Sequence, residues 1–170
     1  DGRRLLAAGR AVDLVYNRLV DFALELPEHA ALRAAYLDRA AVVTPSPWSH
    51  AVFADKRNLA VLCDQERLRG WGLAPAMLAD LAAVPRTLRV TPENTGRLWS
   101  ERKRWFFKPA GRYGSKAVYR GDRITRHVWA EIAEGHYGEY IAQELVPPSE
   151  RIVEIDGARE PRKIDVRLYV

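Results

Sequence analysis

One lysine of this chain stands in an apolar, aromatic run, where an ammonium group needs a partner. Lys108 follows Trp105 and two phenylalanines and precedes Pro109. In a strand, alternation turns Lys108 to the opposite side from Trp105 and Phe107. Burying an unpaired ammonium costs several kcal/mol or drives it neutral, so we expect a bound phosphate or a carboxylate to face it. A surface strand whose lysine points to water would have the same local sequence.

The loop after this run combines two glycines, a hydroxyl and two cations. It consists of Gly111, Arg112, Tyr113, Gly114, Ser115 and Lys116. Glycines let backbone amides approach phosphate oxygens, and Ser115 and Lys116 add donors. The spacing is neither that of a Walker P-loop nor that of a dinucleotide-binding turn. The loop therefore indicates a phosphate contact, with an ordinary hairpin turn as the alternative.

The last eight residues alternate between apolar and polar side chains, as a half-buried strand does. One face would carry Ile164, Val166, Leu168 and Val170, and the other Lys163, Asp165, Arg167 and Tyr169. An acid beside a guanidinium can hold a phosphate in a fixed orientation. A solvated face with a local ion pair is the alternative.

Helical and extended patterns alternate along the chain, which predicts a mixed α and β fold. The first half predicts a short buried strand at 11–16 and a strand that ends within 41–47. Between them, Pro27 and Glu28 open a helix with Leu32, Ala35 and Tyr36 on one face. A further helix starts at Asp55 and carries Leu59, Leu62 and Cys63, and an Ala-rich helix follows at about 74–82. The second half predicts strands at 86–90, 105–109, 117–120 and 139–146. It also predicts a polar helix or loop at 93–103 and a helix at 125–134 with Val128, Trp129 and Ile132 on one side. A hairpin that turns at Asp156-Gly157 comes before the final strand.

Several segments, in this order, resemble the nucleotide-binding core of the ATP-grasp superfamily, the group of the glutathione synthetases, D-alanine:D-alanine ligases and ribosomal-protein glutamate ligases. They are ADKRNLAVL at 54–62, VPRTLRV at 84–90, WFFKPAGRYGSKAVY at 105–119, IAQELVPPSE at 141–150 and KIDVRLYV at 163–170. The resemblance covers about residues 50 to 170. It implies an α+β, ATP-grasp-like fold with the end of a preceding α/β domain at 1–50, a first lobe at 51–103, a lid subdomain at 104–150 and the truncated start of the central catalytic sheet at 151–170.

The resemblance also implies roles for individual residues. Lys56 and Lys108 would reach phosphate oxygens of ATP, and 111–116 would form the lid over the β and γ phosphates. The hinge beside the adenine would be formed by Gln143, Glu144, Leu145 and Val146. Glu150 would contact the ribose hydroxyls. Arg167, in the triplet with Asp165, would contact the transferred phosphate, so Lys108 and Arg167 would be the catalytic residues.

In this family, the magnesium ligands follow the Asp-x-Arg strand, so the resemblance places them after Val170 and none within the chain. We expect the chain to be part of a longer protein, because it starts without Met and stops inside an alternating run. Alone, it is not expected to catalyse. The sequence departs from its relatives at Ala117, where they usually have glycine, and in the hairpin at about 151–162, which lengthens the gap before Asp165.

The composition limits the classes of function. The chain has 170 residues, with 27 Lys and Arg against 22 Asp and Glu and a net charge of +5. This excess suits a nucleic acid, a membrane surface or a nucleotide, and charge alone does not choose between them. A lone Cys63 excludes a disulfide scaffold, and no His or Cys cluster has zinc-site spacing. With no apolar run near the roughly 18 to 20 residues of a membrane helix, we expect a cytoplasmic protein with no membrane partner.

The expected activity is an ATP-dependent ligation of a carboxylate to an amine through an acyl phosphate, with ATP and Mg²⁺ as cofactors and both substrates unidentified. An ATP-grasp kinase and a pseudo-enzyme are alternatives with the same fold. A basic nucleic-acid-binding module is a third, because arginines and aromatic residues are interleaved between 86 and 126. Acids interrupt that stretch, so we do not expect a nucleic-acid partner.

Overall fold

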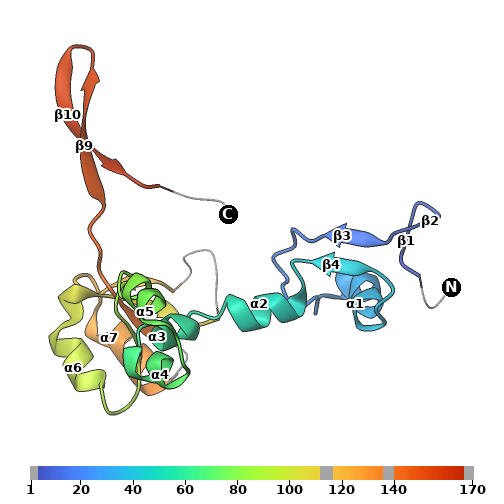
Figure 1. The fold of residues 1–170 in the computed structure, drawn as a ribbon, viewed down its shortest axis with the longest axis horizontal. Coiled ribbons are helices and arrows are strands. Elements are labelled where there is room, and N and C mark those ends of the chain that lie inside the picture. Colours follow the sequence, from blue (N-terminus) through green and yellow to red (C-terminus); the bar gives the residue numbers. More distant parts are fainter. Residues whose placement is uncertain (1–3, 112–116, 136–139, 167–170) are drawn as a thin grey trace.

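The structure is a computed structural model that describes residues 4–111, 117–135 and 140–166. Its helices and strands confirm the predicted mixture of α and β structure. Figure 1 shows three parts: an N-terminal part with β1 to β4 and α1, a body that contains α3 to α7, and a hairpin of β9 and β10 that projects away from the body. Helix α2, Pro47–Phe53, leads from the N-terminal part into the body.

The N-terminal part contains two small ribbons and one helix. β1, Leu6–Ala7, pairs with β2, Arg10–Ala11. β3, Leu14–Tyr16, runs parallel to β4, Val42–Thr44, and the short 3₁₀ turn Pro27–His29 and helix α1, Ala30–Leu37, lie between them in the chain.

The prediction of a buried strand at 11–16 was wrong about its burial. Leu14 is 57% exposed and Tyr16 is 66% exposed, whereas Val43 on the neighbouring strand is 5% exposed. Because side chains alternate across a strand, one face of this ribbon is covered and the face that carries Leu14 and Tyr16 is not. The helix predicted after Pro27 is confirmed, and Ala35 is buried as its apolar pattern requires.

The body begins with short helices whose ends follow from the sequence. They are α3, Arg57–Leu62, α4, Gln65–Gly70, and α5, Pro75–Leu81. The prediction included α3 and α5 but not α2 or α4. Both missed helices have a signal at their first turn, since the Ser46 side chain caps α2 and the Asp64 side chain caps α4.

A four-stranded antiparallel sheet forms the centre of the body, in the order β5-β8-β6-β7. Its strands are β5, Thr87–Arg89, β6, Trp105–Pro109, β7, Tyr119–Arg120, and β8, Tyr140–Glu144. All four were predicted, with longer bounds for β5, β7 and β8. The polar stretch before β6 contains α6, Thr95–Ser100, and a 3₁₀ turn, Arg102–Arg104.

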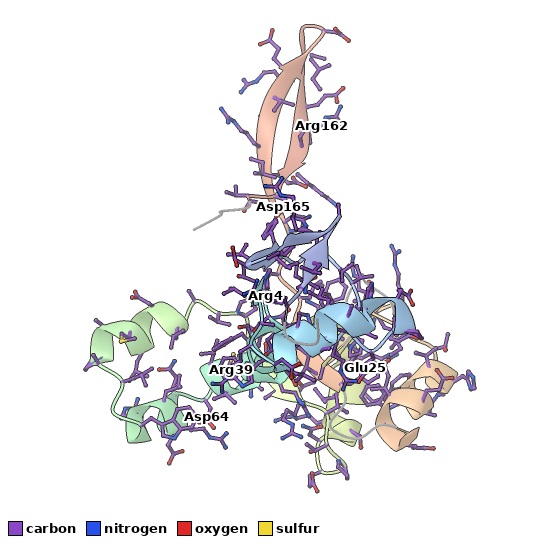
Figure 2. All side chains as sticks on the ribbon, turned by 90° about the vertical axis from the view of Figure 1, so that its right-hand side faces the viewer. Arg4, Glu25, Arg39, Asp64, Arg162 and Asp165 are labelled. Carbon is purple, nitrogen blue, oxygen red and sulfur yellow. The ribbon has the colours of Figure 1, made fainter. Side chains whose placement is uncertain are left out.

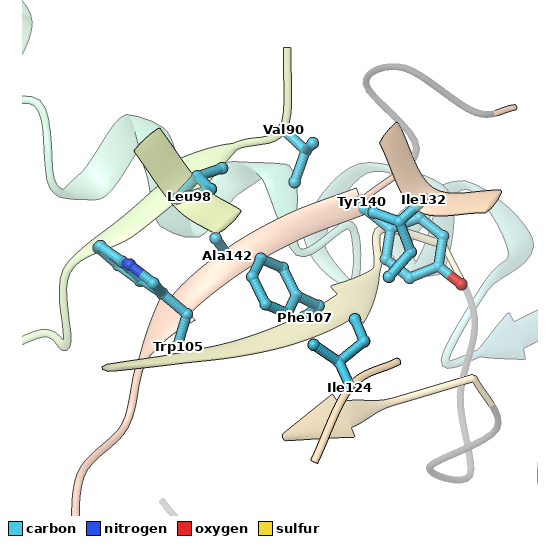
Figure 3. Packing of buried hydrophobic residues seen from close by; sticks show 8 residues of the cluster. All are labelled: Val90, Leu98, Trp105, Phe107, Ile124, Ile132, Tyr140 and Ala142. Atoms are coloured by element: carbon cyan, nitrogen blue, oxygen red, sulfur yellow. The ribbon is translucent and has the colours of Figure 1, made fainter. Parts of the chain in front are cut away.

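One face of this sheet is the core of the protein. Trp105 and Phe107 of β6 are 1% and 0% exposed, and Phe107 lies opposite Ala142 of β8. They pack with Leu98 of α6 and Ile132, which lies in a wide turn at Glu131–Gly135 that continues α7, Arg126–Ala130. Figure 3 shows these side chains between the sheet and the helices. The predicted alternation in β6 is therefore confirmed.

The hairpin consists of β9, Ser149–Ile155, and β10, Ala158–Ile164, joined by Asp156 and Gly157. Both turn residues have positive φ, 50° and 78°, as a two-residue hairpin turn requires. The predicted hairpin is confirmed.

The final strand was predicted to continue with Val166 on a core face, which was wrong. β10 ends at Ile164, and Val166 is 73% exposed because the hairpin projects from the body and none of the described elements covers it.

Candidate functional site

The second face of the sheet is polar where β5, β6 and β8 meet. The register places Phe106 and Thr87 on either side of Gln143, and Lys108 opposite Ile141. The Lys108 Nζ donates a hydrogen bond of 2.6 Å to the Gln143 Oε1. The Gln143 Nε2 in turn donates to the Thr87 Oγ1 over 3.3 Å. The Thr87 hydroxyl donates to the Pro85 carbonyl at 2.9 Å, so the chain of bonds fixes which end of the Gln143 amide faces Lys108.

A second lysine comes to the same place from a distant part of the sequence. Lys56 precedes α3, and its backbone N–H donates to the Ala110 carbonyl over 3.1 Å. The Lys56 Nζ also reaches this carbonyl, at 3.4 Å. Since Ala110 directly follows β6, these bonds join the start of α3 to the strand that carries Lys108. The two lysines therefore lie at the same end of β6.

The start of α3 is fixed by Asp55. Its carboxylate accepts a 2.8 Å hydrogen bond from the Arg57 backbone N–H and forms an ion pair with the Arg57 guanidinium. The hydrogen bond from the Arg57 side chain holds the pKa of Asp55 below its usual value of 3.8. The acidic helix start predicted from the sequence is thus present, and it holds the backbone from which Lys56 projects.

The electrostatics of this place favour an anion. Burial, together with the nearby charge of Lys56, lowers the pKa of Lys108 from its usual 10.5. Among the described residues, Lys108 has no carboxylate at ion-pair distance, and its partner is the neutral amide oxygen of Gln143. The facing carboxylate that the sequence allowed for is therefore not found among those residues. An anion between the two ammonium groups would relieve their repulsion and offset the desolvation of Lys108.

The expected hinge, Gln143 to Val146, lies at the end of β8 and the residues after it. The Glu144 N–H donates to the Arg86 carbonyl, and the Leu145 N–H donates to the Arg104 carbonyl, both at 2.8 Å. The Glu144 carboxylate is 3.4 Å from the Arg104 guanidinium. Val146 is 61% exposed. Of these four residues, Val146 is the one whose backbone N–H has no acceptor among the described residues.

The structure does not bring every candidate residue to this place. Glu150 and Asp165 are exposed and lie at the ends of the hairpin strands, with Asp165 at the hairpin base in Figure 2. Gly111 is exposed and follows Ala110. Six candidates lie outside the described residues: Arg112, Tyr113, Gly114, Ser115, Lys116 and Arg167.

Sequence reasoning missed the side chains of Gln143 and Thr87. Gln143 was assigned only a backbone contact, yet its amide orients Lys108. The available signal was alternation in β8, which puts Gln143 on the face opposite Ala142 and therefore on that of Lys108 once the strands pair in antiparallel register. Thr87 could be placed on this face only once the pairing of β5 with β8 was known.

Within 4–111, 117–135 and 140–166, no group of three or more His, Cys, Asp or Glu side chains could hold a metal ion. No helix in the same ranges is long and apolar enough to cross a membrane. Comparison with known proteins adds no family, because no protein-family model matches the chain and no curated protein matches it.

Proposed function

We propose that this chain is the ATP-binding part of an ATP-dependent ligase that joins a carboxylate to an amine. The observation that supports this most is the approach of Lys56 and Lys108 to one end of β6 from separate segments. A neutral amide holds Lys108 in place, and burial together with the nearby Lys56 charge lowers the Lys108 pKa, so a bound polyanion would stabilise the charged form of Lys108. The order of the segments that resemble the ATP-grasp superfamily supports a triphosphate as that polyanion.

The chemistry we assign is phosphoryl transfer from ATP to a carboxylate, which yields an acyl phosphate and ADP. An amine then attacks the acyl carbon and releases inorganic phosphate. Such a reaction needs alignment and charge neutralisation more than covalent help from the protein. Lys56 and Lys108 would hold phosphate oxygens during transfer, and Mg²⁺ would supply further neutralisation of the developing negative charge.

The adenine would lie beside the residues that follow β8. Because the N–H groups of Glu144 and Leu145 are already bonded within the protein, the Val146 N–H is the donor we assign to the adenine ring. The exposed Val146 side chain offers an apolar contact next to it. The Gln143 amide would remain on Lys108 and keep its ammonium directed at the phosphates.

Thermal unfolding with and without ATP and Mg²⁺ tests the binding proposal. Ligand that binds only the folded chain raises the melting temperature. We expect ATP to raise it in the wild type and in Lys103→Met, a control that removes an exposed lysine near β6. Lys56→Met and Lys108→Met should each lose most of the shift. An equal shift in Lys108→Met and Lys103→Met would refute the assignment.

Turnover is tested in a protein that contains this chain together with the magnesium ligands that the resemblance implies. There, Lys108→Ala should abolish nucleotide-dependent reaction while the fold is retained. Release of ADP and phosphate only when an amine is present would support the ligase. A phosphorylated hydroxyl product would instead identify a kinase.

A further inference from the structure

A pocket of about 380 Å³ lies in the N-terminal part, where the loop at 21–26 meets α1 and α2. Ligand pockets range from about 300 to 1,000 Å³, so this one has room for a single small ring compound. Neither Lys56 nor Lys108 lines it, so it is distinct from the proposed nucleotide site. Three elements contribute its aromatic and charged side chains: Phe22 and Glu25 from the loop, Arg33 and Tyr36 from α1, and Trp48 and His50 from α2.

The walls of the pocket are mostly aromatic. The rings of Phe22 and His50 stack, with 3.6 Å between their centroids and 12° between their planes. Trp48 is 61% exposed, and its ring meets that of Phe53 edge-on at 5.9 Å. Tyr36, which faces the pocket from α1, is half-buried. A flat aromatic ligand would cover apolar ring surface that Trp48 now presents to solvent.

The loop side of the pocket is fixed by the protein itself. The Asp21 carboxylate accepts the Leu26 N–H at 2.9 Å and lies 2.7 Å from the His29 Nδ1. Leu24 is 0% exposed, and its φ of 55° is rare for a bulky side chain. Such a backbone conformation persists only where its surroundings determine it. The loop is therefore preorganised, which reduces the entropy lost when a ligand binds.

Two charged side chains of opposite sign complete the lining. Arg33 and Glu25 both line the pocket and are exposed. Neither forms an ion pair with another residue of the part of the chain that the structure describes. A single cation with a single anion gives the pocket no net formal charge, counting His50 as neutral. This balance suits a ligand that carries both charges and does not select for a polyanion such as a nucleotide.

We propose that this pocket binds a free aromatic α-amino acid. The ring would lie among the aromatic walls, beside Trp48 and Tyr36. The carboxylate would accept hydrogen bonds from the Arg33 guanidinium, and the ammonium group would pair with the Glu25 carboxylate. An aromatic residue inside a polypeptide has neither charge, so the two charged side chains select the free amino acid. Binding needs neither lysine of the nucleotide site.

Isothermal titration calorimetry with L-phenylalanine as the probe tests the proposal at low ionic strength. Three analogues remove one feature each: phenethylamine lacks the carboxylate, 3-phenylpropionate lacks the ammonium group, and L-leucine lacks the ring. We expect each of the first two to bind on the order of tenfold more weakly than L-phenylalanine. L-Leucine should bind about fivefold more weakly. N-acetyl-L-phenylalanine amide, which lacks both charges, should be the weakest.

Variants assign each charge of the probe to one side chain. Arg33→Met should weaken the binding of L-phenylalanine on the order of tenfold and should not weaken that of phenethylamine. Glu25→Gln should have the same effect on L-phenylalanine and should not weaken the binding of 3-phenylpropionate. The matched control is Arg39→Met, which removes an exposed arginine just after α1 that does not line the pocket. Figure 2 shows Arg39 apart from Glu25.

Four results would overturn the proposal. They are no heat of binding for L-phenylalanine, equal affinity for its N-acetyl amide, equal loss in Arg33→Met and Arg39→Met, and a loss in Arg33→Met that is as large for phenethylamine as for L-phenylalanine. Equal affinity for the amide would identify the pocket as a docking site for an aromatic residue of a polypeptide. Lys108→Met separates this inference from the proposed function, because it should remove ATP binding and leave amino-acid binding unchanged.

Discussion

The two faces of β6 differ in what they contribute to the protein. Trp105 and Phe107 point to one side and are almost completely buried among apolar side chains. Lys108 points to the other side, where its neighbours are an amide and a second lysine. The apolar face contributes most of the free energy of folding, because burial of large side chains is its main source. The polar face lowers the stability of the folded protein, because it keeps the charged Lys108 half-buried.

This difference predicts which substitutions unfold the protein and which remove only its binding capacity. Core residues of β6 should be needed for stability and should tolerate no loss of volume. The cations on the opposite face should be replaceable with little loss of stability. Substitutions on each face, with a matched control on the other, test the comparison.

The largest effect is expected from Phe107→Ala. Phe107 is 0% exposed at the centre of the core. Removal of its ring should lower the free energy of unfolding by about 3 to 5 kcal/mol, as measured by urea denaturation. Phe106→Ala, one residue away on the polar face and only half-buried, is the control and should cost about 1 kcal/mol. Equal losses would show that the two faces do not differ in the way we describe.

A slightly smaller effect is expected from Gly121→Ala at the edge of the apolar face. The Gly121 N–H donates to the Trp105 carbonyl at 2.9 Å, and a Cβ there would lie 1.9 Å from the Arg102 carbonyl oxygen. Because backbone atoms cannot move aside as a side chain can, we expect a loss of about 3 kcal/mol in urea denaturation.

Gly111→Ala is the matched control for Gly121→Ala. Gly111 follows the same strand on the side of the candidate nucleotide site, and a Cβ there meets nothing within 4 Å. Its stability should change by less than about 0.5 kcal/mol. A large loss at Gly111 would contradict our conclusion that a Cβ fits at Gly111 but not at Gly121.

The sequence predicted the apolar face well because its signal is local. Large apolar side chains alternate in Trp105 to Phe107, and helix caps and turn residues such as Asp156-Gly157 stand next to the elements they limit. These patterns depend on neighbours in the chain. Burial of the strand at Leu14 was wrong, because it depends on which layers cover a ribbon and not on the strand itself.

The polar site was predictable only in part, since its parts come from three segments. Local pattern identified Lys108 as a cation on the face opposite the core. The approach of Lys56 depends on a contact with Ala110, and the role of Gln143 depends on the pairing of β6 with β8. Both contacts are set by register and by the path of α3, and no single segment encodes them.

A third prediction concerns the segment that brings Lys56 to the polar face. Asp55→Ala removes the carboxylate that accepts the Arg57 N–H and should cost about 1 kcal/mol. Asp55→Asn keeps an acceptor and should cost less. Because the folded pKa of Asp55 lies below 3.8, the wild-type advantage over Asp55→Ala should be present above that pH and disappear on acidification. Urea denaturation at several pH values measures both effects, and an advantage that grew on acidification would contradict the assigned ion pair.

The smallest effect should come from Lys108→Met, and its sign is informative. At neutral pH, the lost Gln143 hydrogen bond and the relieved burial of charge oppose each other, so stability should change by only about 0.5 kcal/mol. The folded pKa of Lys108 lies below 10.5, so between these two pKa values the unfolded chain binds more protons than the folded chain. The free energy of unfolding of the wild type should therefore rise with pH relative to that of Lys108→Met, as far as about pH 10.5.

Urea denaturation from neutral to alkaline pH measures this difference, with Lys103→Met as the control for the loss of one positive charge. A difference that falls with pH would mean that the charged form of Lys108 is favoured in the folded protein and already has an anionic partner. In that case the positive charge of Lys108 would already be compensated within the protein, and the polar face would not bind a phosphate.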